Sequence, residues 1–145
     1  MKIIATNKYV KSQYEIIHKY EAGIVLNGPE VKSIRAANVN LRGSYAVFKQ
    51  NELYLVNMHV SQYMAVEMDE TRSRKLLLRK NEMRRIKHEI DSKQLTLVPL
   101  KIYFTPRSLI KVEIAIAKGL KKHDKREILK KRDVEKQINK KLTFS

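Results

Sequence analysis

Alternating apolar and polar positions near the C-terminal third of the chain predict a β-hairpin. Over 109–118, Ile110, Val112, Ile114 and Ile116 alternate with Lys111, Glu113, Ala115 and Ala117. This period of two is typical of a strand with one buried face. A second apolar run, Leu95 to Phe104, lies just before it. The segment 105–108 between the two runs reads Thr-Pro-Arg-Ser, which is typical of a turn.

Earlier runs predict three more strands. Tyr14 to Leu26 is strand-like, and Gly23 inside it indicates a bulge or a sharp bend. The runs 44–49 and 53–60 are joined by Gln50-Asn51-Glu52 and predict a second hairpin. Residues 2–13 are polar and predict a loosely held arm, and 61–71 has no clear period and predicts an exposed loop.

Two segments have helical signals. Asn27 before Gly28-Pro29 favours a helix start, with Val31 and Ile34 facing inward and an end near Ala37. Asn81 is a candidate cap for a helix over 82–92, whose apolar stripe would be Met83, Ile86 and Ile90. About five strands and two short helices suit a small, mostly antiparallel barrel, of which the oligonucleotide-binding (OB) barrel is one kind.

The charge of the chain points to a polyanionic partner. It holds 31 Lys and Arg against 15 Asp and Glu, which gives a net charge of +16 and a pI near 10.1. Nucleic acid is the first candidate for a partner of such a chain, and an anionic membrane surface the second. With no cysteine, no signal-like start and no long apolar stretch, we expect a cytoplasmic protein without disulfides.

The last part of the chain differs from the rest. From Lys118 to Ser145 there are eleven Lys or Arg residues and four acidic ones. The apolar stripe is thin, and many like charges lie four residues apart, so a helix there is marginal without a partner. We therefore expect a body over 1–118 and a basic tail over 119–145 that is disordered when free and helical on its partner.

No residue pattern indicates an enzyme. The four histidines, His18, His59, His88 and His123, have no metal-ligand spacing, and neither a Gly-rich phosphate loop nor a nucleophile elbow is present. We expect no catalytic residue, no metal and no cofactor. Of the seven tyrosines, two or three would stack on RNA bases and the others would pack in strands.

Strings of residues in order along the chain resemble the SsrA-binding protein (small protein B) family. They are Tyr20-Glu21-Ala22-Gly23, Gly28-Pro29-Glu30-Val31-Lys32-Ser33-Ile34-Arg35-Ala36, Val39-Asn40-Leu41, Ser44-Tyr45, Arg72-Ser73-Arg74-Lys75-Leu76-Leu77-Leu78, Ala117-Lys118-Gly119 and His123-Asp124-Lys125-Arg126-Glu127.

The resemblance implies a fold and a function. The fold would be mostly β, a small antiparallel OB-type barrel with two or three flanking short helices and a basic C-terminal tail. The function would be that of a ribosome-rescue factor of trans-translation. It would bind the tRNA-like domain of transfer-messenger RNA (SsrA RNA) and help deliver it, with elongation factor Tu, to stalled ribosomes. The tail would enter the empty messenger channel.

The resemblance also implies roles for particular residues. Glu21 and Leu77 match body positions that contact the tRNA-like domain, and Arg72, Arg74 and Lys75 would contact phosphates. Arg79 stands where the family usually has a His or Asn. Gly119, Asp124, Lys125 and Arg126 match ribosome-engaging tail positions, and His123 would stack near the decoding centre. The sequence also departs from the pattern at Glu70, Ala37 and Leu120.

The residues alone leave other functions open. A ribosomal or rRNA-binding structural protein fits the charge equally well, whereas an RNA-processing enzyme and a membrane-surface protein fit less well. From the string 72–78 we also predict that the leucines lie in the core and the basic residues on the surface. Replacing Arg72, Arg74 and Lys75 by Ala should then weaken RNA binding and spare the fold.

Overall fold

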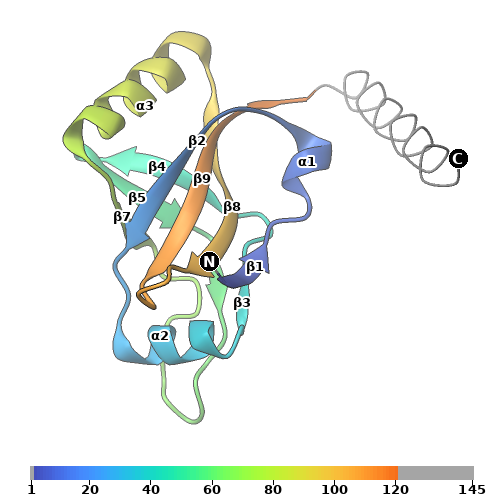
Figure 1. Cartoon of the computed structure of the whole chain (residues 1–145), viewed down its shortest axis with the longest axis vertical. Coiled ribbons are helices and arrows are strands. Elements are labelled where there is room, and N and C mark those ends of the chain that lie inside the picture. The colour runs from blue at the N-terminus through green and yellow to red at the C-terminus, as the bar shows by residue number, and fades with distance from the viewer. Residues whose placement is uncertain (1, 121–145) are drawn as a thin grey trace, which may run out of the picture.

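The computed structural model describes residues 2–120, which form a mostly β structure with three helices (Figure 1). A seven-stranded sheet has the order β1-β8-β4-β5-β7-β2-β9, and β9 also pairs with β8. Every pairing is antiparallel. Because of the last pairing, the strands from β8 through β4, β5, β7 and β2 to β9 form a closed ring, with β1 added beside β8.

The strongest predicted strands are present. β8 (Thr96–Phe104) and β9 (Ile110–Gly119) form the predicted hairpin, closed by the pair Phe104 and Ile110. β2 (Tyr14–Ile24) pairs with β9 along nearly its whole length. The bulge predicted at Gly23 is wrong, because the irregularity lies between Ile16 and His18. Gly23 instead allows a close approach: a Cβ there would lie 3.3 Å from the Cβ of Leu77 on β7.

The second predicted hairpin is also present, but its second strand is shorter. β4 (Tyr45–Lys49) pairs with β5 (Glu52–Val56) across a turn in which Gln50 and Asn51 both have positive φ. The chain then bends at Asn57, which also has a positive φ. The residues that follow leave the large sheet: β6 (His59–Val60) pairs with β3 (Val39–Asn40) in a separate two-stranded sheet. Residues 61–73 form the predicted loop, and β7 (Arg74–Leu77) then lies between β5 and β2.

The N-terminal prediction of a loose arm is wrong. β1 (Lys2–Thr6) pairs with β8, and α1 (Val10–Gln13) follows it. Val10 is buried against Val98 and Ala117. The arm is polar in sequence because only one side of it is buried, and the buried positions are too few to give a clear period.

Both predicted helices form. α2 (Gly28–Arg35) begins at Asn27, whose side chain accepts from the backbone of Glu30 while Glu30 accepts from the backbone of Asn27. α3 (Lys80–Lys93) begins two residues before its predicted start, with Arg79 rather than Asn81 at the cap. Its stripe is as predicted, with Ile86 buried and Met83 and Ile90 half-buried. Among residues 2–120, no helix is long and apolar enough to cross a membrane.

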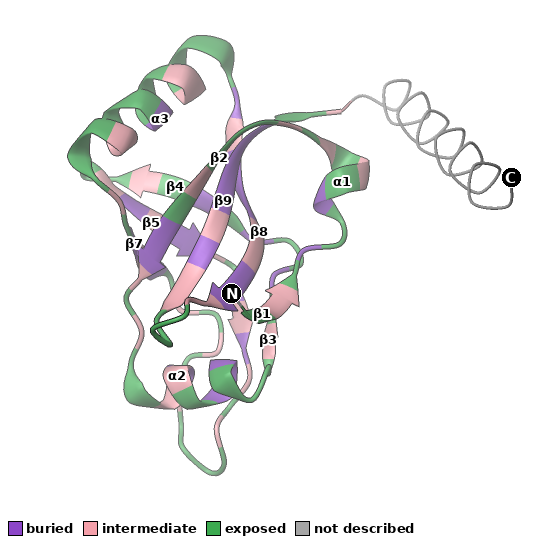
Figure 2. Cartoon of the chain, viewed as in Figure 1, coloured by how far each residue is buried: buried purple, intermediate pink, exposed green. Residues whose placement is uncertain are grey.

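One continuous core fills the ring of strands (Figure 2). It is built from the inward positions of the strands together with Ile34 from α2 and Ile86 from α3; the strand residues include Leu53, Leu55, Leu76, Leu97, Ile102, Val112, Ile114 and Ile116. α2 and α3 therefore cover two ends of the same core, which is why the α2 cap and the α3 stripe could both be found from sequence.

A buried ion pair lies beside this core and was not predicted. Glu30 on α2 and Arg74 on β7 are both 0% exposed, and Arg74 Nε donates to a Glu30 oxygen. The other Glu30 oxygen accepts from Arg72, at 2.5 Å. Arg74 also donates to the carbonyls of Met58, at 2.8 Å, and Glu70, at 3.2 Å. The guanidinium thus joins α2, β7 and the loop before β7.

The predicted surface position of Arg74 is therefore wrong. A buried cation is retained only with a partner and hydrogen bonds, and the sequence could not show that Glu30, 44 residues earlier, supplies them. Replacing Arg72, Arg74 and Lys75 together would unpair Glu30, so the prediction that this change spares the fold is wrong as well.

We predict that Glu30→Gln lowers the free energy of unfolding by about 3 kcal/mol, because it leaves the Arg74 charge buried and unpaired. Urea unfolding followed by circular dichroism measures this. Glu52→Gln is the matched control: it removes the carboxylate of an exposed pair with Lys75, so the melting temperature should barely change. Equal loss in both variants would contradict a special role for Glu30.

The same pair gives a pH dependence. Burial alone would raise the pKa of Glu30, but hydrogen bonds from Arg72, the Asn27 backbone and Arg74 together hold the pKa below its ordinary 4.5. A lowered folded-state pKa stabilises the fold above pH 4.5 and loses that contribution as the pH falls through the lowered value. The stability difference between wild type and Glu30→Gln should therefore shrink on acidification below pH 4.5.

Candidate nucleic-acid interface

Three of the residues singled out from the sequence come together in one surface hollow. The hollow has a volume of about 580 Å³, and we call it the β2–β7 hollow. It is formed by β2, β7, β9 and the start of α3, with the lining residues Glu21, Gly23, Leu77, Leu78, Arg79, Glu82 and Lys111. Glu21, Leu77 and Arg79 were predicted from the sequence, and the structure adds Lys111, Glu82 and Gly23.

Strand alternation turns these side chains outward. On β7, Leu76 is buried in the core, so Leu77 points to the opposite face and is 50% exposed. The prediction that this leucine lies in the core is therefore wrong, although its prediction as a contact residue requires exposure. Leu77 lies opposite Gly23 on β2, and Gly23 lies opposite Lys111 on β9. The period of two over 109–118 already placed Lys111 on the polar face, but the sequence did not reveal that this face borders β2.

Glu21 is held in place by a neighbour. The hydroxyl of Tyr103 on β8 donates to a Glu21 oxygen. Burial, and then the hydrogen bond and charge of Glu21, raise the pKa of Tyr103, so the phenol remains a donor at neutral pH. Glu113 lies directly opposite Glu21 across β2 and β9, and its charge is partly offset by Lys101 at 3.8 Å. The Glu21 carboxylate is thus an oriented acceptor on an exposed strand.

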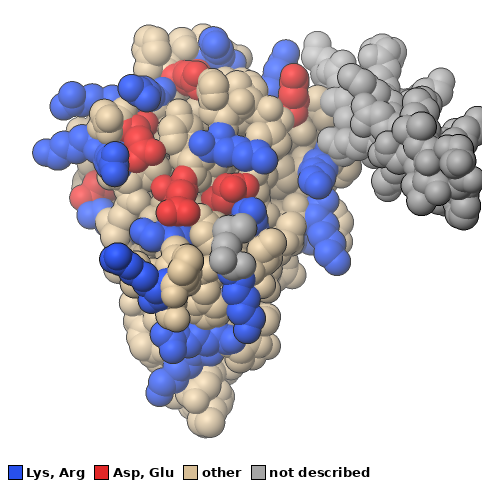
Figure 3. Space-filling model, in the orientation of Figure 1, with Lys and Arg blue, Asp and Glu red and all other residues tan. Residues whose placement is uncertain are grey.

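The hollow is not simply basic. Arg79 and Lys111 can contact phosphates, Glu21 and Glu82 can accept from amino or hydroxyl groups, and Leu77 offers apolar contact. Figure 3 shows acidic side chains among Lys and Arg on the face drawn there. Two carboxylates weaken a purely electrostatic attraction for phosphates, so this combination favours a ligand recognised by shape and hydrogen bonds as well as by charge.

The basic string before the leucines does not enter the hollow. Lys75 lies on the outer face beside Tyr54, and its Nζ is 2.9 Å from Glu52. The hydrogen bond from Lys75 to Glu52 raises the pKa of Lys75. Arg72 contacts Glu30 and its side chain remains 39% exposed. Of the three predicted phosphate contacts, Arg72 and Lys75 are accessible and Arg74 is not.

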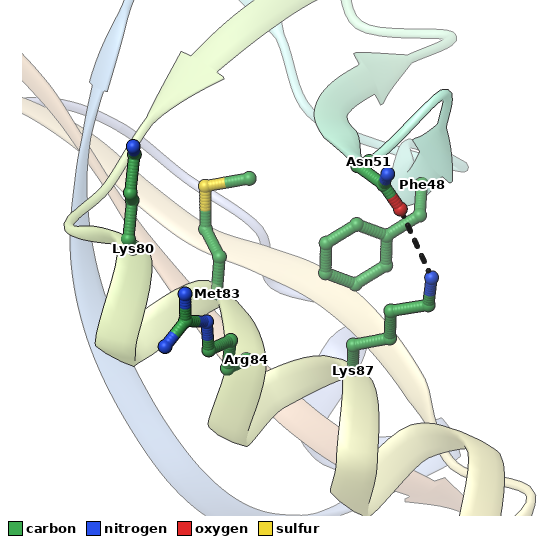
Figure 4. Close-up of a pocket in the computed structure, with 6 residues that line it drawn as sticks. All are labelled: Phe48, Asn51, Lys80, Met83, Arg84 and Lys87. Atoms are coloured by element: carbon green, nitrogen blue, oxygen red, sulfur yellow. Dashed lines mark hydrogen bonds between the residues drawn. The ribbon is translucent and has the colours of Figure 1, made fainter.

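A separate hollow lies between α3 and the β4–β5 hairpin (Figure 4). Its volume is about 500 Å³. Lys80, Met83, Arg84 and Lys87 face it from α3, with Phe48 and Asn51 on the other side; Lys87 donates to Asn51 at 3.2 Å. The lining contains three cations and no acid, so it can attract an anion, although none of the residues predicted from sequence lies here.

The predicted tail lies almost wholly outside the described residues. β9 runs through Gly119, one residue beyond the predicted end of the body, and the Leu120 backbone N–H donates to the Gln13 carbonyl at 2.9 Å. His123, Asp124, Lys125 and Arg126 lie outside the described residues. Within residues 2–120, no group of three or more His, Asp or Glu side chains is placed to hold a metal ion.

A family model described as SmpB protein matches residues 4–144 of the chain. The chain belongs to the SmpB protein family. The SsrA-binding protein of Mycoplasmopsis pulmonis is 57% identical over 143 residues, which cover 99% of each chain. The SsrA-binding protein of Thermosipho africanus is 46% identical over 142 residues, covering 96% of this SmpB-family chain and 95% of the relative.

A solved structure gives the same family by shape. This SmpB-family chain superposes with a TM-score of 0.69 and 44% identity on a chain from a structure described as "tmRNA-SmpB: a journey to the center of the bacterial ribosome". The match covers 86% of the present chain and 93% of that chain.

Proposed function

We propose that the protein is an RNA-binding ribosome-rescue factor of trans-translation, which binds the tRNA-like domain of transfer-messenger RNA (tmRNA, also called SsrA RNA). The observation that carries the proposal is the match over 99% of the chain to a protein named SsrA-binding protein. The net charge of +16 supports an RNA partner, because much of RNA-binding affinity comes from neutralised phosphates.

The β2–β7 hollow is the proposed contact with the tRNA-like domain. Arg79 and Lys111 would contact phosphates, and the oriented carboxylate of Glu21 would accept from a base amino group or a ribose hydroxyl. Leu77 would pack on a base or a sugar. Arg72 and Lys75 would add phosphate contacts outside the hollow, and Arg74 has no direct role because it is buried.

The remaining parts of the proposal rest on the family resemblance. The closed ring of strands supports an OB-type barrel. The proposed body spans 1–118, extended by the observed end of β9 to Gly119. Residues from Gly119 onward, with His123, Asp124, Lys125 and Arg126, would occupy the messenger channel of a stalled ribosome. Elongation factor Tu would be a partner through the RNA, in the cytoplasm.

A first experiment measures affinity for the tRNA-like domain by filter binding. Arg79→Ala and Lys111→Ala should each weaken binding about fivefold, equivalent to about 1 kcal/mol for a lost charged contact, with unchanged melting temperature. Lys49→Ala, an exposed cation on β4 away from the hollow, is the control and should have little effect. If about six phosphates are neutralised, raising salt from 50 to 200 mM should weaken binding on the order of a thousandfold, on the scale known for duplex DNA.

Two results would contradict this placement: an affinity that hardly changes with salt, or a loss in Lys49→Ala equal to that in the two hollow variants. The first would remove the electrostatic contribution, and the second would leave the hollow without a specific role.

A second experiment separates body from tail. We predict that a fragment ending at Leu120 folds and binds the tRNA-like domain, because residues 2–120 contain the whole described core, but does not support tagging on stalled ribosomes. Replacing Asp124, Lys125 and Arg126 together by Ala should abolish tagging as well. This change lowers the net charge by one unit only, so a tail that acted by charge alone would hardly respond. Full tagging by either variant would overturn the proposed role of the tail.

A further inference from the structure

A second concave site lies on another part of the molecule. It is bounded by α1, by the segment from Arg42 to Tyr45 and by β8, and its volume is about 220 Å³. We call it the tyrosine pocket, because its walls include Tyr9, Tyr14 and Tyr45. It shares no lining residue with the β2–β7 hollow.

The pocket contains a buried acceptor without a partner. Asn7 is 7% exposed, and its Nδ2 donates to two backbone carbonyls, those of Pro99 at 3.1 Å and Leu41 at 3.3 Å. Because both carbonyls require a donor, they fix the orientation of the amide. Its Oδ1 is then left buried with no hydrogen-bond partner. Such unpaired groups are uncommon and costly, so each calls for an explanation.

The surroundings of Asn7 are suited to a flat ring. Tyr9 and Tyr45 are exposed aromatic side chains, and the Arg42 guanidinium lies 4.3 Å from the centre of the Tyr9 ring. Buried Val10 and Val98 give the pocket an apolar base. Tyrosine rings and arginine planes are the groups on which proteins stack unpaired bases. No Asp or Glu lines the pocket, and Arg42 supplies a positive charge.

The volume fits the same ligand. It is several times the roughly 30 Å³ share of a water molecule, so one bound water would not fill it. It is also below the roughly 300 Å³ at which pockets for drug-sized ligands begin, which suits one planar ring system.

We propose that the tyrosine pocket binds one unpaired RNA base that bears an exocyclic amino group, such as adenine or cytosine. The amino group donates to Asn7 Oδ1, the ring stacks on the tyrosines, and Arg42 contacts the adjoining phosphate. Uracil presents a carbonyl at the equivalent position, and two acceptors would then face each other. The inference rests on the proposed RNA-binding function and adds a second contact with a stated base preference.

The place of the pocket supports a role for this contact. β9 ends beside α1, where Leu120 donates to Gln13 at 2.9 Å, and Gln13 also lines the pocket (Figure 1). A base bound here would lie next to the point at which the chain continues into residues 121–145. The β2–β7 hollow lies on different elements, so both sites can be occupied together.

NMR titration of the full-length protein tests the proposal with AMP, CMP, UMP and ribose 5-phosphate as probes. AMP and CMP should shift the side-chain amide signal of Asn7 and the ring signals of Tyr45. UMP should bind about fivefold more weakly because the Asn7 acceptor stays unpaired, and ribose 5-phosphate should leave these signals unchanged.

Variants separate stacking from charge. Tyr45→Ala should weaken AMP binding at least about fivefold through lost stacking, without changing the melting temperature, since Tyr45 is 39% exposed. Tyr63→Ala, in the loop before β7, is the matched control and should bind AMP as wild type does. Asn7→Ala should remove the preference for AMP over UMP, and Tyr45→Ala keeps the test valid if Asn7→Ala fails to fold.

Equal binding of AMP and UMP, shifts that ribose 5-phosphate reproduces, or equal losses in Tyr45→Ala and Tyr63→Ala would each overturn the proposal. Loss of the pocket's base preference with intact binding of the tRNA-like domain would leave the proposed function standing. Failure to bind the tRNA-like domain would refute the function, whatever the mononucleotides do.

Discussion

The arrangement of the RNA-facing surface depends on one buried ion pair, between Glu30 and Arg74. Strand side chains alternate between faces, so burying Arg74 on β7 fixes Lys75 and Leu77 on the outer face. A slip of one residue would turn Leu77 inward and expose the arginine. The same guanidinium binds two backbone carbonyls near β7, so it also fixes the end of the 61–73 loop. A fully buried cation is costly unless it is paired, and here the pairing determines which face of β7 can meet a partner.

The surface that results combines two physical requirements. The high positive charge attracts RNA over long range without selecting among RNAs. The β2–β7 hollow adds a carboxylate held by Tyr103, an exposed leucine and two cations, and the tyrosine pocket adds a buried acceptor between aromatic rings. These features lower the attraction for phosphate alone but reward a correctly shaped RNA. Selectivity in this account comes from oriented polar groups on rigid strands, with charge supplying the approach.

Sequence predicted what local patterns encode. The period of two over 109–118 and the Asn27–Glu30 cap gave β9 and α2, and family strings gave Glu21, Leu77 and Arg79. It failed where the cause is distant. Arg74 reads as a surface cation until Glu30 is known to face it, and Asn7 reads as part of a polar arm until Leu41 and Pro99 are placed beside it. Lys111 was assigned correctly to a polar face, but its neighbours across the sheet depend on a pairing between β2 and β9 that no local pattern specifies.

Mapping the RNA contacts on the protein tests the central claim, that the β2–β7 hollow is the recognition surface, most directly. Full-length protein bound to the tRNA-like domain would be cross-linked by ultraviolet light, and the cross-linked peptides identified by mass spectrometry. The account predicts cross-links in peptides that contain Glu21, Leu77 to Glu82, and Lys111. Cross-links that avoid all three segments and lie elsewhere on residues 2–120, for example on the α3 and β4–β5 side, would contradict it.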